Sequence, residues 1–407
     1  MKDRPLLRKG ALAPSRCARS RRELVAASLL GIALGSAAQA AEEPAPLLRI
    51  GVSVGLTGEY QNIARLQQRA YLLWQKNVNE RGGILGRRVQ VVIRDDRSDP
   101  ETARKIYETF INEERMDFVF GPYSTANTEA IAPIIDRHGY PTLTAGATAD
   151  GLWRRGYRNL FGVYSPASRY AMGFLALLAE AGIQHIAIVS ANDGFSVEAS
   201  TGMRVWAPQY ALKVASFATV SKDKDEMRRA AQAAQRAGAQ ALLVAGHFNE
   251  SVDMRKVLKE VHWSPRAYYA TVGPAVDRYA ELLGEDAEAT FSTSVWEPRE
   301  DLRFPSSPEF LRQFVATYAE TPSYHAATAY AAGQILEQAI VKSASVDRAK
   351  VREALYLVDA DSVIGRYAVD RTGMQIKRFP MIVQWQGAKR EIVWPPELRT
   401  ALPVIAK

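Results

Sequence analysis

Short apolar runs alternate with helical apolar patterns along most of the chain after residue 47. The first unit has an apolar run at 48–54, a helical pattern over 64–80 and a second apolar run at 88–94. This order predicts parallel strands, because each helix carries the chain back across a sheet before the next strand begins. The pattern starts again near residue 170 with the same order and similar spacing. We therefore predict an α/β fold with two doubly wound parallel-sheet lobes.

The chain is expected to cross between these lobes more than once. The segment 158–168 has the character of an extended crossing, and after 291–295 the chain is expected to return to the first lobe. The tail alternates like antiparallel strands around a turn at 370–373. We assign residues 47–165 plus 295–363 to lobe 1 and residues 166–294 plus 364–400 to lobe 2. Several crossings imply a multi-strand hinge that allows the lobes to close on a small molecule.

The first 40 residues have the three parts of a secretory signal peptide. A basic segment, 1–22, precedes an apolar run at 24–34 and a small-residue cleavage site at 38–40. The pair Arg21 and Arg22 resembles a twin-arginine signal, and a general Sec signal with a long basic region is an equal alternative. The apolar run is too short to remain as a membrane span. We therefore predict export to the periplasm and removal of residues 1–40.

Removal of this segment changes the charge and the cysteine content. The formal net charge of +8 falls to about +2, because the segment carries most of the basic excess. No basic stripe then remains to favour nucleic acid. The only cysteine, Cys17, precedes the apolar run, so it cannot become a lipidated first residue. A mature chain of this kind has no disulfide, thiolate metal site or cysteine nucleophile. We expect it to be soluble, monomeric and not lipid-anchored.

Two polar loops follow neighbouring predicted strands between residues 117 and 148. The strand 118–120 leads into a cluster of hydroxyl and amide side chains, and the strand 140–143 leads into the loop 144–148. Both loops would emerge at the carboxyl edge of a parallel sheet, where such folds hold ligands. Ser124 or Thr125 also begins the next helix, so hydroxyls and free N–H groups would converge on a carboxylate or another small acceptor. The alternative is that these residues only cap the helix.

The motifs typical of enzymes are missing from the sequence. The five histidines have no metal-ligand spacing, and the Gly-rich segment 51–58 matches neither a dinucleotide fingerprint nor a phosphate loop. No Gly-x-Ser-x-Gly elbow is present. The pair Asp95 and Asp96 lies at a strand end, where capping or solvent exposure is the ordinary role. We therefore predict a binding protein without catalysis, cofactor or metal.

Several short motifs, in their order along the chain, resemble those of type I periplasmic binding proteins of the leucine/isoleucine/valine-binding family, the solute receptors of ABC importers. The resemblance covers essentially all of the chain after residue 47. The motifs that carry it are IG at 50–51 with LTG at 56–58, NERGGILG at 79–86, DD at 95–96 with DP at 99–100, GPYST at 121–125, GAT at 146–148, GEDAE at 284–288, YHAA at 324–327 and the hairpin 364–373.

This resemblance implies a ligand site between the lobes. In the family, a hydroxyl in the loop after a Gly-containing strand holds the ligand's carboxylate. Here that hydroxyl belongs to Thr125, or to Ser124 if the register slips by one. The next contacts fall in the loop 146–148, and Phe195 and Phe248 would form the wall across the cleft. Tyr60 or Ile63 would line the first-loop side. The predicted ligand-binding residues are Tyr60, Ser124, Thr125, Gly146, Ala147, Thr148, Asp193, Phe195, Phe248 and Val272.

One position departs from the family pattern. Amino-acid binders of the family place an acid after the strand that ends near Ala270, where it neutralises the ligand's ammonium. The matching residue here is Val272, or Ala275 if the Gly-Pro pair is aligned, and the stretch 270–276 contains no acid. A buried ammonium without a partner is strongly unfavourable. Asp193 or Glu250 is an alternative acid, although each could equally be a helix-start residue.

We therefore predict a periplasmic substrate-binding protein of a branched-chain-amino-acid-type ABC importer. Its ligand would be an amino acid, an organic or aromatic acid, or an amide, and its partner would be the inner-membrane permease. The alternative is a ligand-sensing regulator on the same fold, for amides or aromatic acids. The signal peptide argues against a cytoplasmic partner for such a regulator.

Overall fold

The computed structural model describes residues 47–406. The predicted signal peptide lies outside the described residues. Two large sheets organise the described chain, and both are mainly parallel, as the alternation of strand and helix patterns predicts.

The first sheet is entirely parallel and has the strand order β2-β1-β3-β4-β5. The order reverses direction at β1, so a crevice forms beyond the carboxyl ends of β1 and β3. The apolar runs read from the sequence become the strands of this sheet, which are buried except for the edge strand 89–95, most of which is half-buried. The strands are β1 (Leu48–Val54), β2 (Val89–Asp95), β3 (Phe118–Gly121), β4 (Thr142–Thr144) and β5 (Leu160–Gly162).

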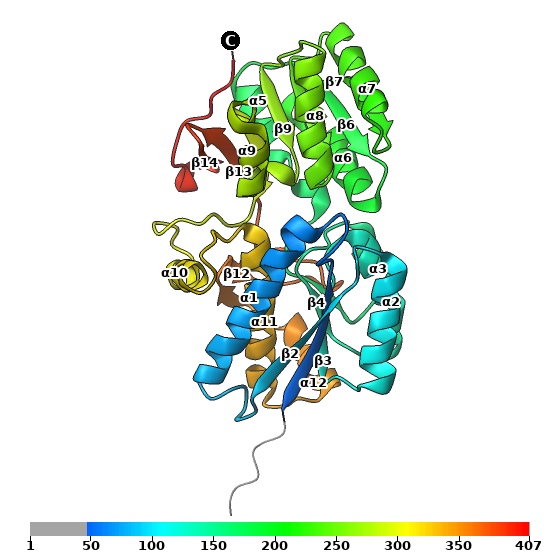
Figure 1. Cartoon of the computed structure of the whole chain (residues 1–407), viewed down its shortest axis with the longest axis vertical. Coiled ribbons are helices and arrows are strands. Elements are labelled where there is room, and N and C mark those ends of the chain that lie inside the picture. Colours follow the sequence, from blue (N-terminus) through cyan, green and yellow to red (C-terminus); the bar gives the residue numbers. More distant parts are fainter. Residues whose placement is uncertain (1–46, 407) are drawn as a thin grey trace, which may run out of the picture. The chain divides into compact units, whose positions relative to one another are not determined.

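Helices cover both faces of the first sheet (Figure 1). On one face, α1 (Gln61–Glu80) packs along α11 (Tyr324–Ser343), and on the other α2 (Pro100–Glu108) packs along α3 (Thr125–Arg137). The Ala-rich sequence of α11 permits the close approach to α1. A Cβ on Gly333 would lie 2.2 Å from Cδ2 of Trp74. The start of α2 follows from capping, because Asp99 accepts a hydrogen bond from the backbone N of Thr102.

The second sheet repeats the plan and extends it. Its order is β14-β13-β10-β9-β8-β6-β7, so the parallel strands β7-β6-β8-β9-β10 reproduce the order of the first sheet. Two antiparallel strands, β13 and β14, complete the edge beside β10. The strands are β6 (His185–Ala191), β7 (Lys213–Val220), β8 (Ala241–Ala245), β9 (Ala267–Ala270), β10 (Thr290–Ser294), β13 (Met381–Gln386) and β14 (Lys389–Trp394).

Alternate residues of β6 face different layers of the second lobe. Ala187 and Val189 pack in one cluster with residues of α7 (Lys224–Arg236) and α8 (Phe248–Glu260). Ile186 and Ile188 belong to another cluster, together with residues of α5 (Met172–Glu180) and α6 (Gly194–Trp206). This period of two explains why the strand is apolar over 186–189, since both of its faces are covered.

The remaining elements connect or flank these layers. The chain continues from β10 into α10 and α11, which contact α1, and returns to the second sheet at β13. The other helices are α4 (Gly151–Arg154), α9 (Asp277–Leu283), α10 (Ser307–Tyr318) and α12 (Arg348–Tyr356). The short helical turns are η1 (Thr109–Glu113), η2 (Ala167–Arg169), η3 (Ala207–Tyr210), η4 (Gly273–Ala275), η5 (Gly284–Ala287) and η6 (Pro396–Leu398).

Two segments differ in detail from their expected conformation. The expected crossing at 158–168 contains β5, which pairs with β4 and completes the first sheet before the chain leaves it. In the tail, β12 (Gly365–Tyr367) pairs with β11 (Ala360–Ser362) in a separate hairpin, whereas β13 and β14 join the second sheet. Local alternation predicts strand character but does not choose the pairing partner. The residue boundaries of the lobes stay a prediction.

Among residues 47–406, no helix is both long enough and apolar enough to span a membrane.

Candidate functional site

The loop after β3 supplies the first part of a cavity beside the switch point of the first sheet. Ser124 has a positive φ of 81° and caps α3, and its Oγ accepts a hydrogen bond of 3.2 Å from the backbone N of Asn127. The next residue, Thr125, lines the cavity. Its Oγ1 accepts from the backbone N of Ala149 at 3.4 Å. The proton of the Thr125 hydroxyl therefore remains free to donate to a solute.

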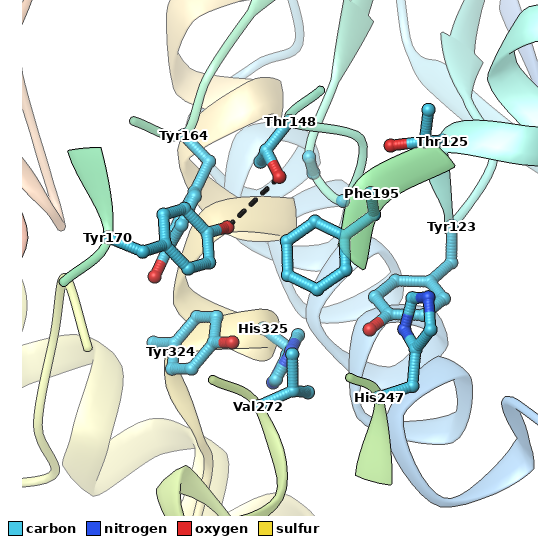
Figure 2. Close-up of a pocket in the computed structure, with 12 residues that line it drawn as sticks. Tyr123, Thr125, Thr148, Tyr164, Tyr170, Phe195, His247, Val272, Tyr324 and His325 are labelled. Carbon is cyan, nitrogen blue, oxygen red and sulfur yellow. Dashed lines mark hydrogen bonds between the residues drawn. The ribbon is translucent and has the colours of Figure 1, made fainter. Parts of the chain in front are cut away.

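The loop after β4 forms the neighbouring part of the same wall. Ala145, Gly146 and Thr148 line the cavity. A Cβ on Gly146 would lie 2.6 Å from Cδ2 of Tyr123, so this close approach requires glycine. The hydroxyl of Tyr170 donates a hydrogen bond of 3.1 Å to Oγ1 of Thr148. Figure 2 shows this bond, with Thr125 on the same side of the cavity.

Loops at the carboxyl ends of the second sheet form the opposite wall. Phe195 follows β6, His247 follows β8 and Val272 follows β9. Tyr164 and Tyr170 come from the segment between β5 and α5, and Tyr324 and His325 begin α11. In Figure 2 the ring of Phe195 lies between the two threonines and the histidines. The cavity therefore combines hydroxyl groups with a mostly aromatic surface.

The cavity is small, because its lining side chains nearly fill it: a free volume of about 20 Å³ is left, enough for about one water molecule. The twelve lining residues are Tyr123, Thr125, Ala145, Gly146, Thr148, Tyr164, Tyr170, Phe195, His247, Val272, Tyr324 and His325.

Five predicted site residues line this cavity, and five lie around it. Thr125, Gly146, Thr148, Phe195 and Val272 are in the lining. Outside the lining, Ser124 caps α3, and Ala147 packs in the apolar cluster around α2 and α3. Asp193 caps α6 and contacts His247. Phe248 is buried as the first residue of α8. The ring of Tyr60 packs against the rings of Tyr123 and His247. The roles assigned to all ten in ligand binding stay predictions.

Sequence reasoning did not select seven of the lining residues. Ala145 and Tyr123 are immediate neighbours of selected loop residues, and His247 is one position before Phe248. These three could have been found by including whole loops at the strand ends. Tyr324 and His325 begin the YHAA motif that carries part of the family resemblance, and that motif could have marked them. Tyr164 and Tyr170 gave no such signal, since they come from a crossing segment. Only the folded chain brings them to the cavity.

His247 is buried, and its surroundings favour the charged form. Its Nε2 lies 3.4 Å from Oδ1 of Asp193. Burial alone would lower the pKa of His247, but the hydrogen bond and charge of Asp193 outweigh it, and Glu250 and Glu59 add to the rise. The same contact acts in the other direction on Asp193. Burial raises the pKa of the Asp193 carboxyl, but the contact with His247 and the hydrogen bonds from Ser196 outweigh burial and bring this pKa well below its ordinary value.

His325 lines the same cavity under opposite conditions. Burial and, second, the positive charge of His247 lower the pKa of His325 to about 3. Its ring stacks on that of Tyr324 with centroids 3.8 Å apart, and Nδ1 lies 3.3 Å from Oγ of Ser323. The cavity thus holds His325, which is neutral at neutral pH, beside His247, whose protonation is favoured by its surroundings.

Asp and Glu side chains are absent from the lining of the cavity. The nearby acids already have partners: Asp193 contacts His247, and the Glu250 carboxylate accepts from the backbone N of His247 at 3.0 Å. A buried ammonium group would therefore find no free acid in this lining. Nor do residues 47–406 contain a cluster of three or more His, Cys, Asp or Glu side chains suited to a metal.

The chain also matches known proteins over most of its length. The family model described as periplasmic binding protein matches residues 48–390. Among curated proteins, the Leu/Ile/Val-binding protein homolog 7 of Brucella suis biovar 1 (strain 1330) is 23% identical over 398 residues. That match covers 92% of this chain and 96% of the relative.

Solved structures share the same arrangement of strands and helices. The branched-chain amino acid transporter substrate binding protein LivJ from Streptococcus pneumoniae, in complex with isoleucine, has a TM-score of 0.77 at 19% identity, covering 85% of this chain and 98% of that one. A solute binding protein of an ABC transporter from R. palustris, in complex with benzoate, has a TM-score of 0.73 at 17% identity, covering 89% and 98%. The predicted α/β fold with two lobes is confirmed.

Proposed function

The chain belongs to the periplasmic binding protein family, and on that premise we propose that it is the solute receptor of an ABC importer. We propose further that it captures a small carboxylate solute in the cavity lined by Thr125, Thr148 and Phe195. The family consists of solute-binding proteins, and the proposed role involves no reaction. In this role the mature chain acts as a monomer in the periplasm and delivers its solute to an inner-membrane permease.

The observation that carries the proposal is a set of neutral donors without an accompanying acid. The hydroxyls of Thr125 and Thr148 and the backbone beside Gly146 face a buried cavity. Hydrogen bonds to a charged acceptor are stronger than those between neutral groups, so such donors suit a carboxylate. The family's usual solute, an amino acid, would also need an acceptor for its ammonium. The position that matches the family's acid by resemblance is Val272, or Ala275 if the Gly-Pro pair is aligned, and neither is an acid.

The lining rings narrow the class of solute. Tyr164, Tyr170, Phe195 and Tyr324 surround the cavity with aromatic surface, which favours a flat or branched apolar group. The benzoate complex of the R. palustris protein supports an acid of this kind, because that protein shares the fold and binds an acid without an amine.

Capture requires contacts from both lobes. A solute shifts the equilibrium toward the closed state only if it binds that state more tightly than the open one. Thr125 follows a strand of the first sheet, and Phe195 follows a strand of the second. A solute that touches both side chains therefore favours closure.

The test is direct binding to residues 41–407, the mature chain, after unfolding and refolding to remove any co-purified solute. Calorimetry and thermal shift would compare benzoate, 4-methylpentanoate, leucine and benzamide. We expect the two acids to raise the unfolding midpoint by mass action and leucine to bind more weakly. Tighter binding of leucine than of both acids would contradict the proposal.

A matched pair of variants locates the site. Thr125→Val removes one hydroxyl from the cavity lining with little change of volume. Thr290→Val makes the same change at a buried position on β10, outside the cavity lining. Acid binding should weaken in the first variant only. Equal affinity in both variants would place the acid elsewhere.

A further inference from the structure

One ring nitrogen of His247 has no hydrogen-bond partner among the described residues. Nε2 contacts Asp193, whereas Nδ1 is buried and unpaired. The residue is 7% exposed and lines the cavity. A buried polar atom usually has a partner, so an unpaired one beside a cavity indicates a group that the solute supplies.

The surroundings of His247 stabilise a positive charge on its ring. Three aromatic rings lie near it: those of Tyr60 and Phe195, with centroids 5.3 and 5.1 Å away, and that of Tyr123 at 6.3 Å. Such rings attract a cation.

The titratable and charged groups around His247 come from five elements. They are Glu59 and Tyr60 after β1, Tyr123 after β3, Asp193 before α6, Glu250 on α8 and His325 on α11. The acids outweigh the cost of burial and raise the pKa of His247, while His325 is neutral. In the protonated form, which these acids favour, the imidazole has two N–H donors, and Nδ1 then presents a donor rather than an acceptor.

We propose that His247 determines the class of acid that the cavity accepts: its Nδ1–H donates to an oxygen on the solute, which selects 2-oxo acids over 2-amino acids. This inference rests on the proposed capture of a carboxylate. The 2-oxo acid offers a carboxylate to the threonine hydroxyls and a carbonyl oxygen to Nδ1. Asp193 is a positioning residue, because it holds the ring through Nε2 and does not line the cavity.

The chemistry of the second polar group explains the selection. An ammonium has donors only, and it would meet both the donor Nδ1–H and the positive charge of His247. A carbonyl oxygen has acceptors only, and it satisfies the unpaired donor. The simple acid, without a group at carbon 2, leaves Nδ1 unpaired. The expected order of affinity is therefore oxo acid, simple acid, amino acid.

The experiment compares acids that share one carbon skeleton. Calorimetry at pH 6 on the refolded mature chain would use 4-methyl-2-oxopentanoate, 4-methylpentanoate and leucine, followed by phenylpyruvate, 3-phenylpropanoate and phenylalanine. We expect the oxo acid of at least one skeleton to bind at least about tenfold more tightly than the simple acid, as for a hydrogen bond to a charged group. The amino acid should bind more weakly than both.

Variants of His247 test whether this residue is responsible. His247→Phe keeps a ring but removes the donors, and His247→Gln keeps a neutral donor. We expect the oxo preference, the ratio of the oxo-acid affinity to the simple-acid affinity in the same variant, to disappear in His247→Phe and to shrink in His247→Gln. His138→Gln, at the exposed end of α3, is the matched control and should change nothing. Circular dichroism would establish that each variant is folded.

The pH profile distinguishes a donor role from a packing role. The oxo preference should fall as pH rises through the raised pKa of His247, because the neutral ring no longer offers a donor at Nδ1. Asp193→Asn should move this fall to lower pH, since it removes the charge that favours protonation.

Two results would overturn the inference and leave carboxylate capture intact. They are equal binding of oxo and simple acids, and an oxo preference that persists in His247→Phe. Tightest binding of the amino acid would contradict this inference and the proposed function together. No binding by any acid of either skeleton, with benzoate also failing, would overturn this inference and the proposed function together.

Discussion

The hydroxyl of Tyr170 donates a hydrogen bond of 3.1 Å to the hydroxyl of Thr148, inside the cavity. This bond occupies an acceptor position on Thr148 and leaves its proton free (Figure 2). Burial raises the pKa of Tyr170 well above its ordinary value, so the phenol stays a donor across the physiological range. Tyr170 lies just before α5, and Thr148 follows β4. The bond therefore orients one hydroxyl of the proposed carboxylate site.

Replacement of Thr148 by valine should weaken the binding of a carboxylate solute. The change removes a hydrogen bond to a charged acceptor at nearly constant volume, which corresponds to about a 10- to 100-fold loss of affinity. Calorimetry with benzoate or 4-methylpentanoate measures the loss. An unchanged dissociation constant for both acids would show that the Thr148 hydroxyl does not contact the solute.

Replacement of Tyr170 by phenylalanine should weaken the same solute less, by about two- to fivefold. The Thr148 hydroxyl remains but loses its fixed orientation. Part of the binding free energy from its hydrogen bond to the solute is then offset by the entropy cost of ordering the hydroxyl. The double variant should bind like Thr148→Val alone, because Tyr170 acts through Thr148. Additive losses in the double-mutant cycle would instead indicate an independent contact between Tyr170 and the solute.

The burial of neutral His325 should reduce stability in acid. Its pKa of about 3 in the folded chain lies below the ordinary value near 6.5, so the unfolded state binds a proton that the folded state excludes. Stability is therefore lost as pH falls from about 6.5 toward 3. Urea unfolding of wild type and His325→Gln at pH 7 and pH 5 measures this. We expect the wild type to lose about 2 kcal/mol more than the variant over this interval. Equal losses would show that His325 is protonated in the folded chain.

The buried ion pair of Arg390 and Glu297 should contribute to stability, because each side chain neutralises the buried charge of the other. Nε of Arg390 lies 2.9 Å from Oε2 of Glu297, and the side chains are 5% and 2% exposed. Arg390→Met leaves a buried carboxylate without this partner and should cost about 3 kcal/mol, measured by urea unfolding. Adding Glu297→Gln should recover part of this cost. Arg278→Met, which breaks the exposed pair with Glu281, is the control and should have little effect. A double variant no more stable than Arg390→Met would contradict the compensation.

The ion pair between Lys222 and Glu59 should slow the release of solute. It joins the segment before α7 to the loop after β1, so it links elements associated with different sheets. Lys222 is largely exposed, and the effect should be small: Lys222→Met is expected to raise the dissociation rate about two- to fivefold at low salt. The difference should vanish at high ionic strength. Lys224→Met serves as the control, because the pair of Lys224 with Asp253 joins α7 to α8. Stopped-flow fluorescence with a bound acid measures the rates, and equal rates in all three proteins would contradict the prediction.

The polar loop after β3 shows how much of the site could be predicted from the sequence. Its position after a short apolar run placed Thr125 at the carboxyl edge of a parallel sheet, and the structure puts that residue in the cavity lining. The same reasoning left Ser124 and Thr125 as alternatives. The positive φ of Ser124 turns its hydroxyl to the backbone of Asn127, so only the backbone conformation separates the two. Phe248 and His247 present the same problem, since the path of the chain at the start of α8 decides which of them lines the cavity.

The sequence by itself determined the order of strands and helices, because periodic burial is a property of consecutive residues. It also showed that the stretch 270–276 contains no acid, since residue identities are read directly from the sequence. The tertiary structure alone decided that Tyr164, Tyr170 and His325 share a cavity with Thr148. It also decided that the carboxylate of Asp193 contacts the ring of His247. These contacts join residues far apart along the chain, and each depends on how β-strand edges and α11 are placed in space. The tertiary structure also decides side-chain pKa values, because burial and neighbouring charge shift the pKa values of His247 and His325 in opposite directions within one cavity.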